Sequence, residues 1–181
     1  MKPVEVEEKF KKTLREIEVS WATKTLKPNV LGFQIQPGTK WLPGLVPAKL
    51  EAYEARLGIM FPDDLRKFYL LANGTDIPNI DLHGSDGRPQ SFGIGIYSYP
   101  SDIEEVEHRI RDLLKFLPQI LSDIESDGIE LGPNPKFVPV FGHRFVLASG
   151  NPNSSVVLSI YEDDAIVYGE DMETYLRHEF L

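Results

Sequence analysis

The sequence predicts a domain of the α+β class. Its first two thirds carry stretches of helical periodicity, whereas its last third is a series of short apolar runs bounded by turn signals, which is typical of strands. Hydrophobic residues make up 41% of the 181 residues, so the chain can build a packed core. A chain of this length is expected to form one domain of generous size, with two small ones as the alternative.

An amphipathic helix is predicted for residues 4–22, because apolar residues recur there every three or four positions between charged ones. This stripe is expected to pack on the core; a docking helix for a partner is the alternative. Residues 24–47 are rich in proline and glycine and are predicted to be irregular. Residues 1–44 are interpreted as a helix and a connection packed on a domain that spans 45–181. The apolar stripe consists of Val6, Phe10, Leu14, Ile17 and Trp21.

Two short helices are predicted between residues 47 and 74. Pro47 suits the first turn of a helix, and Gly58 suits the left-handed position that ends one. Pro62 is expected to be the first residue of the second helix, where two aspartates favour the helix dipole, and an Asn-Gly pair ends that helix. The side chains expected to be largely buried are Leu50, Tyr53, Leu57, Leu65, Phe68 and Leu71.

A polar loop is predicted for residues 74–91, followed by a strand at 92–97. A long helix comes next, with Ser101 as its cap and Glu104 completing a capping box. Pro118 is expected to kink or divide this helix, which an Asp-Gly pair ends.

The last third of the chain is predicted to be mostly strands. The final two strands are expected to form a hairpin with an acidic tip, and an amphipathic helix at 172–180 closes the chain. The predicted strands cover residues 137–141, 145–148, 156–161 and 165–168.

The composition limits the kinds of partner. The 28 Asp and Glu residues exceed the 19 Lys and Arg residues, which gives a formal net charge of −9 at pH 7. Nucleic acid and anionic lipid surfaces repel such a protein, so the expected partner is a basic protein; the alternative is that the charge only maintains solubility. The absence of cysteine excludes disulfides and favours a cytoplasmic location. No apolar segment is typical of a signal peptide or long enough to span a bilayer.

No complete catalytic motif is visible. The Gly-Ile-Gly sequence at 93–95 lacks the third glycine and the following helix of a dinucleotide site, and no serine lies in a nucleophile elbow. The four histidines are not paired at metal-ligand spacing. An enzyme that acts around His83, with a cation held by Asp81, His83 and Asp86, is the alternative, although the spacing differs from that of a calcium loop. The chain is therefore predicted to be non-catalytic and to hold neither a metal nor a cofactor.

Acidic residues gather in two segments, which are the predicted partner-binding residues. The first segment spans the last hairpin and the start of the closing helix, and its carboxylates are expected to converge and to steer a basic partner. A solvated turn followed by an acidic helix N-terminus is the alternative. The second segment lies in the polar loop. The first group is Glu162, Asp163, Asp164, Glu170 and Asp171, and the second is Asp76, Asp81 and Asp86.

The segment 50–74, LEAYEARLGIMFPDDLRKFYLLANG, resembles the signature of the SMI1/KNR4 family, also called SUKH. That signature has a glutamate shortly before a Leu-Gly pair, then an apolar-Pro step, then a helix that ends in Asn-Gly. Phe61 stands where leucine is commoner. The resemblance covers roughly residues 45–181, fits less sharply toward the C-terminus, and leaves the N-terminal helix outside. The matching residues are Glu54, Leu57, Gly58, Phe61, Pro62, Leu65, Phe68, Asn73 and Gly74.

This resemblance implies a mostly antiparallel sheet flanked by helices, to which the N-terminal helix is an extension. In bacteria it also implies an immunity protein that neutralises a toxin, often a nuclease or a deaminase; in fungi it implies a regulator of cell-wall synthesis. We therefore expect a non-catalytic immunity protein that binds a basic toxin domain directly. An intracellular scaffold or regulator that binds an endogenous partner is the alternative.

Overall fold

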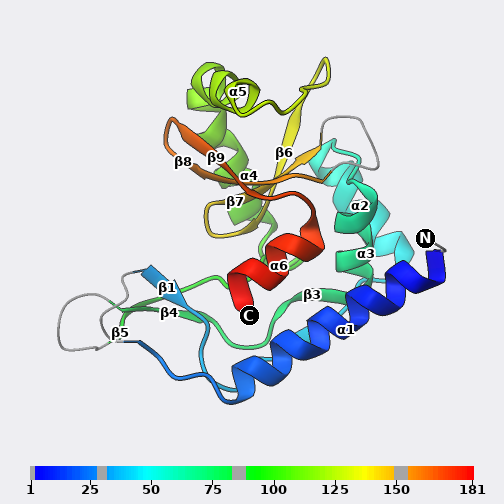
Figure 1. The fold of residues 1–181 in the computed structure, drawn as a ribbon, viewed down its shortest axis with the longest axis vertical. Helices are drawn as coiled ribbons and strands as arrows, with labels where there is room; N and C mark the ends of the chain where they lie inside the picture. Colours follow the sequence, from blue (N-terminus) through cyan, green and yellow to red (C-terminus); the bar gives the residue numbers. More distant parts are fainter. Residues whose placement is uncertain (1–2, 28–31, 83–88, 149–154) are drawn as a thin grey trace.

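The structure, a computed structural model, describes residues 3–27, 32–82, 89–148 and 155–181. Its largest sheet is antiparallel, with the strand order β6-β7-β8-β9 and helices on both faces (Figure 1). The predicted α+β class, with antiparallel sheets and an N-terminal helix, is confirmed. The four strands are β6 (Lys136–Phe141), β7 (Arg144–Ala148), β8 (Val157–Tyr161) and β9 (Asp164–Gly169).

Side chains of the large sheet alternate between two hydrophobic cores. Val146 and Val157 face the core that contains α6 (Met172–Phe180), whereas Leu147 and Leu158 face the core that contains α5 (Leu117–Ser126). This alternation follows from the pleat of a strand, in which successive side chains point to opposite faces. Because helices cover both faces, these strands are apolar almost throughout. Figure 1 shows the sheet between α5 and α6.

The predicted pair of short helices is present as α2 (Pro47–Leu57) and α3 (Asp63–Leu71). Gly58 ends α2 in the left-handed conformation, with a φ of 64°. Pro62 is the N-cap of α3 rather than its first helical residue. Of the six side chains expected in the core, Leu50, Tyr53, Leu65 and Phe68 are fully buried, while Leu57 and Leu71 are partly buried.

The glutamate of the motif at 50–74 holds the corner between α2 and α3. The backbone N–H of Phe61 donates to Glu54 Oε1 at 2.8 Å, and the other carboxylate oxygen of Glu54 pairs with Arg66. A buried backbone donor without a partner would cost about 1–3 kcal/mol. Glu54 therefore stabilises the tight connection that orients the two helices.

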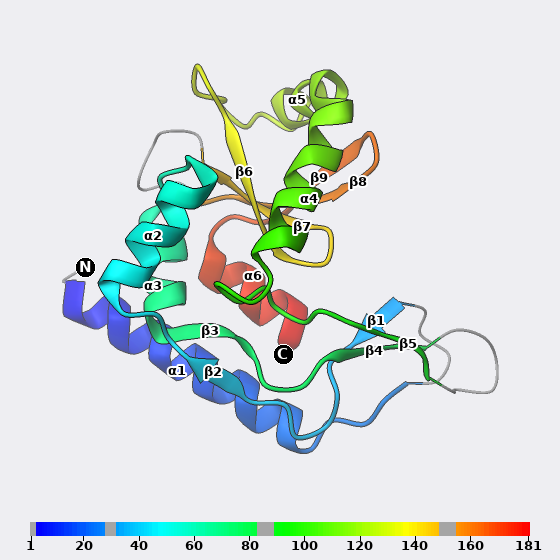
Figure 2. The same cartoon turned by 180° about the vertical axis from the view of Figure 1, so that it is seen from behind.

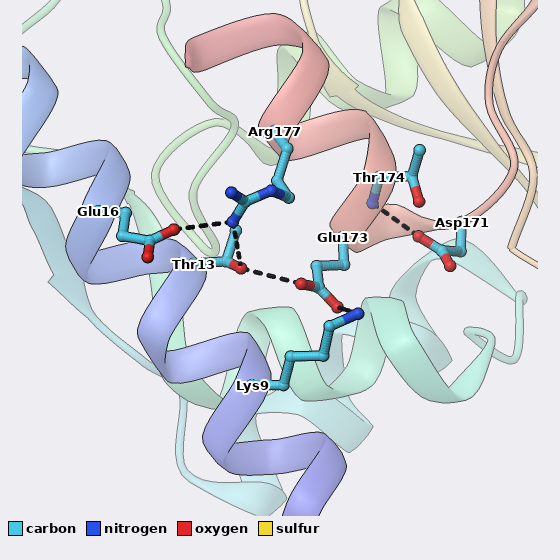
Figure 3. A network of polar contacts seen from close by, with 7 residues as sticks. All are labelled: Lys9, Thr13, Glu16, Asp171, Glu173, Thr174 and Arg177. Carbon is cyan, nitrogen blue, oxygen red and sulfur yellow. Dashed lines mark hydrogen bonds and ion pairs between the residues drawn. The ribbon is translucent and has the colours of Figure 1, made fainter.

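The N-terminal helix α1 (Pro3–Ala22) packs along α6 (Figure 3). Thr13 Oγ1 donates to Glu173 at 2.9 Å, and Lys9 Nζ lies 2.9 Å from the same carboxylate. Arg177 joins the network from α6 through Glu16, at 2.8 Å. Of the predicted stripe, the side chain of Val6 lies outside the described part of the chain. The other members are buried in the core that also contains α6, and they are Phe10, Leu14, Ile17 and Trp21.

Two segments that were predicted to be irregular contain short strands, so these predictions were wrong. The strands pair in two smaller antiparallel sheets, with the orders β1-β4-β5 and β2-β3. The β1–β4 and β2–β3 pairs join segments far apart in the sequence, whereas β4 and β5 are close neighbours along the chain. Runs this short carry little periodicity of their own. The strands are β1 (Gly32–Gln34), β2 (Trp41–Pro43), β3 (Ala72–Thr75), β4 (Asn79–Leu82) and β5 (Pro89–Gly93).

The start of the long helix also differs from the prediction. The expected strand at 92–97 is wrong, because β5 ends at Gly93 and Ile96 forms only an isolated bridge with Phe141. The cap is Asp102 rather than Ser101, and α4 (Ile103–Leu113) follows it across the back of the sheet (Figure 2). The predicted division near Pro118 is confirmed: a 3₁₀ turn, η1 (Leu114–Phe116), separates α4 from α5.

Candidate protein interface

Two neighbouring hairpin turns of the large sheet lie side by side. The β6–β7 turn contains Gly142 and His143, and the backbone N–H of Ile160 in β8 donates to His143 O at 2.9 Å. The β8–β9 turn joins Tyr161 to Asp164, which face each other across the hairpin. We call residues 161–164 the hairpin tip.

One residue of the hairpin tip has an uncommon backbone conformation. Glu162 has a φ of 54°, in the left-handed region that glycine adopts at lower cost. A side chain with a Cβ costs roughly 1–2 kcal/mol there. The tip therefore presents a carboxylate at a position where glycine would be the less strained residue.

A groove of about 370 Å³ lies between the two turns and the helical segment α4–η1. Its inner wall is apolar, since Leu113, Phe145 and Ile160 all belong to the core between the sheet and α5. Its opening is lined by Phe116, which is 39% exposed, and by Tyr161, which is 68% exposed. We call this hollow the tip groove. Two partly exposed aromatic rings beside an apolar hollow are typical of a surface that binds a protein partner.

The basic side chains around the tip groove are paired within the protein. Lys115 Nζ lies 2.6 Å from Asp112 Oδ1, and this hydrogen bond lowers the pKa of the Asp112 carboxyl. Arg109 Nε donates to Glu105 at 2.7 Å. Both rim cations therefore have internal counterions.

The acidic side chains of the hairpin tip, in contrast, are unpaired. Glu162, Asp163 and Asp164 are exposed, and within the described part of the chain no salt bridge reaches them. Asp123 of α5 adds a further carboxylate nearby, since the backbone N–H of Ala165 lies 3.3 Å from Asp123 Oδ2. The surface around the tip thus carries a negative field that a basic partner would complement.

His143, at the rim of the tip groove, is held in its neutral form. Desolvation lowers the pKa of His143, and the positive charges of Arg144 and Arg109 lower it further. Its ring lies edge-on to that of Tyr161, with 6.2 Å between the ring centroids. His143 therefore adds no positive charge to the rim at neutral pH.

Arg144 anchors the large sheet to α6 behind the hairpin tip. Its guanidinium donates to Glu179 at 2.9 Å and to Ser159 at 2.7 Å, and it lies 3.8 Å from the centre of the Tyr168 ring. These contacts connect three strands with the closing helix. The tip accordingly projects from a rigid base.

The prediction that the C-terminal acids converge is wrong. Glu162 and Asp163 lie at one end of β9, and Glu170 and Asp171 follow its other end. Because β9 is a six-residue extended strand, roughly 17–20 Å separates the two pairs. Asp171 has a local structural role, since its carboxylate accepts the backbone N–H of Thr174 at 2.6 Å as the N-cap of α6 (Figure 3).

The second predicted acidic group is not part of the hairpin tip either. Asp76 lies between β3 and β4, and its carboxylate accepts the backbone N–H of Lys40 at 2.7 Å. Asp81 is a residue of β4, in one of the two smaller sheets. Asp86 and His83 lie outside the described residues. In the part of the chain that is described, no group of three His, Asp or Glu side chains is arranged to hold a metal ion.

The aromatic residues of the tip groove were not predicted. Phe116 comes from the break between two helices, His143 from one turn and Tyr161 from the next, so only the fold brings them together. A weak signal for Phe116 exists in the sequence. The apolar stripe of the long helix predicted there includes Leu113, Leu114 and Leu117 but not Phe116, which is therefore a candidate for exposure.

The structure as a whole defines an α+β domain with an aromatic groove beside an acidic hairpin tip. The chain matches the model of the SMI1/KNR4 family (SUKH-1) over residues 44–177. This match covers well over half of the chain, which therefore belongs to the SMI1/KNR4 family. Comparison with curated proteins and with solved structures gave no match. None of the helices that the structure describes is long and apolar enough to cross a membrane.

Proposed function

We propose that this chain is an immunity protein that neutralises a protein toxin by binding it directly. Its membership of the SMI1/KNR4 family, which is associated with immunity proteins, carries the proposal. The surface around the hairpin tip supports it, because exposed aromatic rings and unpaired carboxylates together suit a basic protein partner. This proposal requires no catalytic residue. The protein acts by covering the surface with which the toxin contacts its own target.

The acidic charge suits a toxin that acts on nucleic acid. A protein surface that binds nucleic acid is basic, because it must neutralise phosphates. The net charge of −9 and the unpaired carboxylates of the hairpin tip would attract such a surface and increase the rate of encounter. The same charges disfavour nucleic acid and anionic membranes as ligands of this chain. We propose that neutralisation takes place in the cytoplasm. Disulfides rarely persist in that reducing compartment, and this chain has no cysteine with which to form one.

The rigid base of the hairpin tip would help the binding. A surface that is ordered before contact loses less conformational entropy on association than a loop that must fold onto its partner. The contacts of Arg144 with Glu179 and Ser159, and the position of Asp123 beside β9, fix the tip from two sides.

Co-expression tests the proposal directly. The chain is expressed in bacteria together with each protein encoded by the adjacent genes, and growth and complex formation by size-exclusion chromatography are measured. We expect one neighbour to stop growth alone, to be tolerated with this chain and to form a stable complex with it. A neighbour that remains toxic without forming a complex would contradict the proposal. A complex with a harmless neighbour would favour a scaffold instead.

A further inference from the structure

We propose that the tip groove receives one apolar or aromatic side chain of a protein partner whose surrounding surface is basic. This inference rests on the proposed function in so far as the partner is a toxin, but it concerns the groove itself. It names the chemistry that the interface recognises: an uncharged anchor in the groove, with Lys or Arg side chains placed over the hairpin tip.

The shape and lining of the groove argue for an apolar anchor. Its volume of about 370 Å³ suits a large side chain together with some of its backbone, and Leu113, Phe145 and Ile160 form its inner wall. Phe116 and Tyr161 both line the groove, one from η1 and the other from the β8–β9 turn, so both elements offer an aromatic ring to an inserted side chain. Such buried anchors carry most of the binding energy of protein interfaces.

The distribution of charge argues for basic surroundings. The rim cations Lys115 and Arg109 are neutralised by Asp112 and Glu105, and His143 is held neutral by its own surroundings. Among the charged residues that line the groove, the one without an internal counterion is therefore Glu162, which belongs to the hairpin tip. The hairpin tip beside it offers three carboxylates without internal partners, which Lys or Arg side chains of the partner would match.

A peptide titration followed by NMR tests the groove without a toxin. The probe is acetyl-Lys-Lys-Trp-Lys-Lys-amide, and the controls replace the tryptophan by alanine or the four lysines by glutamate. We expect saturable shifts of the backbone amides of Phe116, His143 and Tyr161 at millimolar probe, and at least tenfold weaker effects of both controls. Shifts that do not saturate, that spread over the surface, or that are equal for the control peptides would overturn the inference.

Substitutions provide a second measurement. Phe116→Ala and Tyr161→Ala remove exposed rings, so the fold should persist, and each should weaken probe binding at least threefold. Met60→Ala is the matched control, because Met60 is 86% exposed at the corner between α2 and α3. Equal probe affinity of wild type and both groove variants would overturn the inference.

The two proposals can fail separately. If the probe binds in the groove but the chain neutralises no neighbour, the immunity function fails and the groove assignment stands. If the chain protects growth but the probe does not bind the groove, the groove assignment fails and the immunity function stands. Once the toxin is identified, Phe116→Ala and Tyr161→Ala are each expected to raise the Kd of its complex with this chain at least tenfold. Met60→Ala is expected to leave that Kd unchanged.

Discussion

Glu54 illustrates how a residue of a family signature can act on the fold rather than on a ligand. Its carboxylate accepts the backbone N–H of Phe61 and pairs with Arg66, so it orients α3 relative to α2. The sequence could identify the signature but not this role, because the two partners become neighbours only when the chain reverses at Gly58.

We therefore predict that Glu54→Ala lowers the free energy of unfolding by about 1–3 kcal/mol, because it leaves a partly buried backbone donor without a partner. Urea denaturation followed by circular dichroism measures the effect. Glu51→Ala is the control: Glu51 lies on the solvent-exposed side of the same helix, and its loss should change stability by less than about 0.5 kcal/mol. Equal midpoints for the two variants would contradict a role of Glu54 at the corner.

The carboxylates of the hairpin tip are expected to act on rate rather than on stability. Changing Asp163 and Asp164 together to Asn should slow association with a basic partner and weaken its dependence on salt, because both charges are exposed and unpaired. Unfolding should be almost unaffected, since exposed charges contribute little to stability.

Stopped-flow or surface binding kinetics at low and moderate salt would measure this effect. Glu170→Gln provides the matched control, since Glu170 is exposed at the far end of β9. An unchanged association rate for the double variant would show that the tip is an ordinary solvated turn with no steering role. The family assignment would not be affected.

Among the elements, α1 lies outside the family match yet belongs to the main core. Its residue Ile17 is fully buried in the same cluster as Phe180, whereas Val19 is 70% exposed. Ile17→Ala is therefore expected to lower the free energy of unfolding by about 2–5 kcal/mol, and Val19→Ala by less than about 0.5 kcal/mol. Chemical denaturation of the two variants tests this difference. Similar small losses would show that α1 is only loosely attached.

The elements also differ in whether local sequence patterns are enough to predict them. The helices at α2, α3 and α6 follow from 3.6-residue periodicity together with their glycine, proline and aspartate signals, and the β8–β9 hairpin follows from two apolar runs around an acidic turn. In contrast, β1 and β2 contain three residues each and exist because distant strands pair with them. Local patterns cannot encode such pairings.

The candidate site likewise has one part that the local sequence predicts and another that depends on the tertiary structure. The acidic turn at Glu162 and Asp163 is visible in the sequence, because it lies between two strand signals. Its separation from Asp171 depends on the extended length of β9, because residues close in the sequence lie far apart at the two ends of a strand. The groove beside the turn is formed by η1 and two hairpin turns. Phe116 and Tyr161 both line it, although they are 45 positions apart in the sequence. Only the tertiary structure places these residues together.

At the scale of the whole molecule, the two cores on either side of the large sheet hold both hairpin turns in place against α4 and η1. This arrangement presents a groove with an apolar inner wall and an acidic tip on one surface of a protein with a net charge of −9. Long-range attraction and short-range recognition would thus act at the same place, with the charges increasing the rate of encounter and the groove slowing dissociation.

Hydrogen–deuterium exchange of the chain alone and in complex with the protein it neutralises tests this arrangement most directly. We predict slower exchange at residues 113–117, 142–145 and 160–165 in the complex, and unchanged exchange along α1. Slower exchange along the exposed side of α1 or between β3 and β4, with the hairpin tip unaffected, would contradict the assignment of the interface.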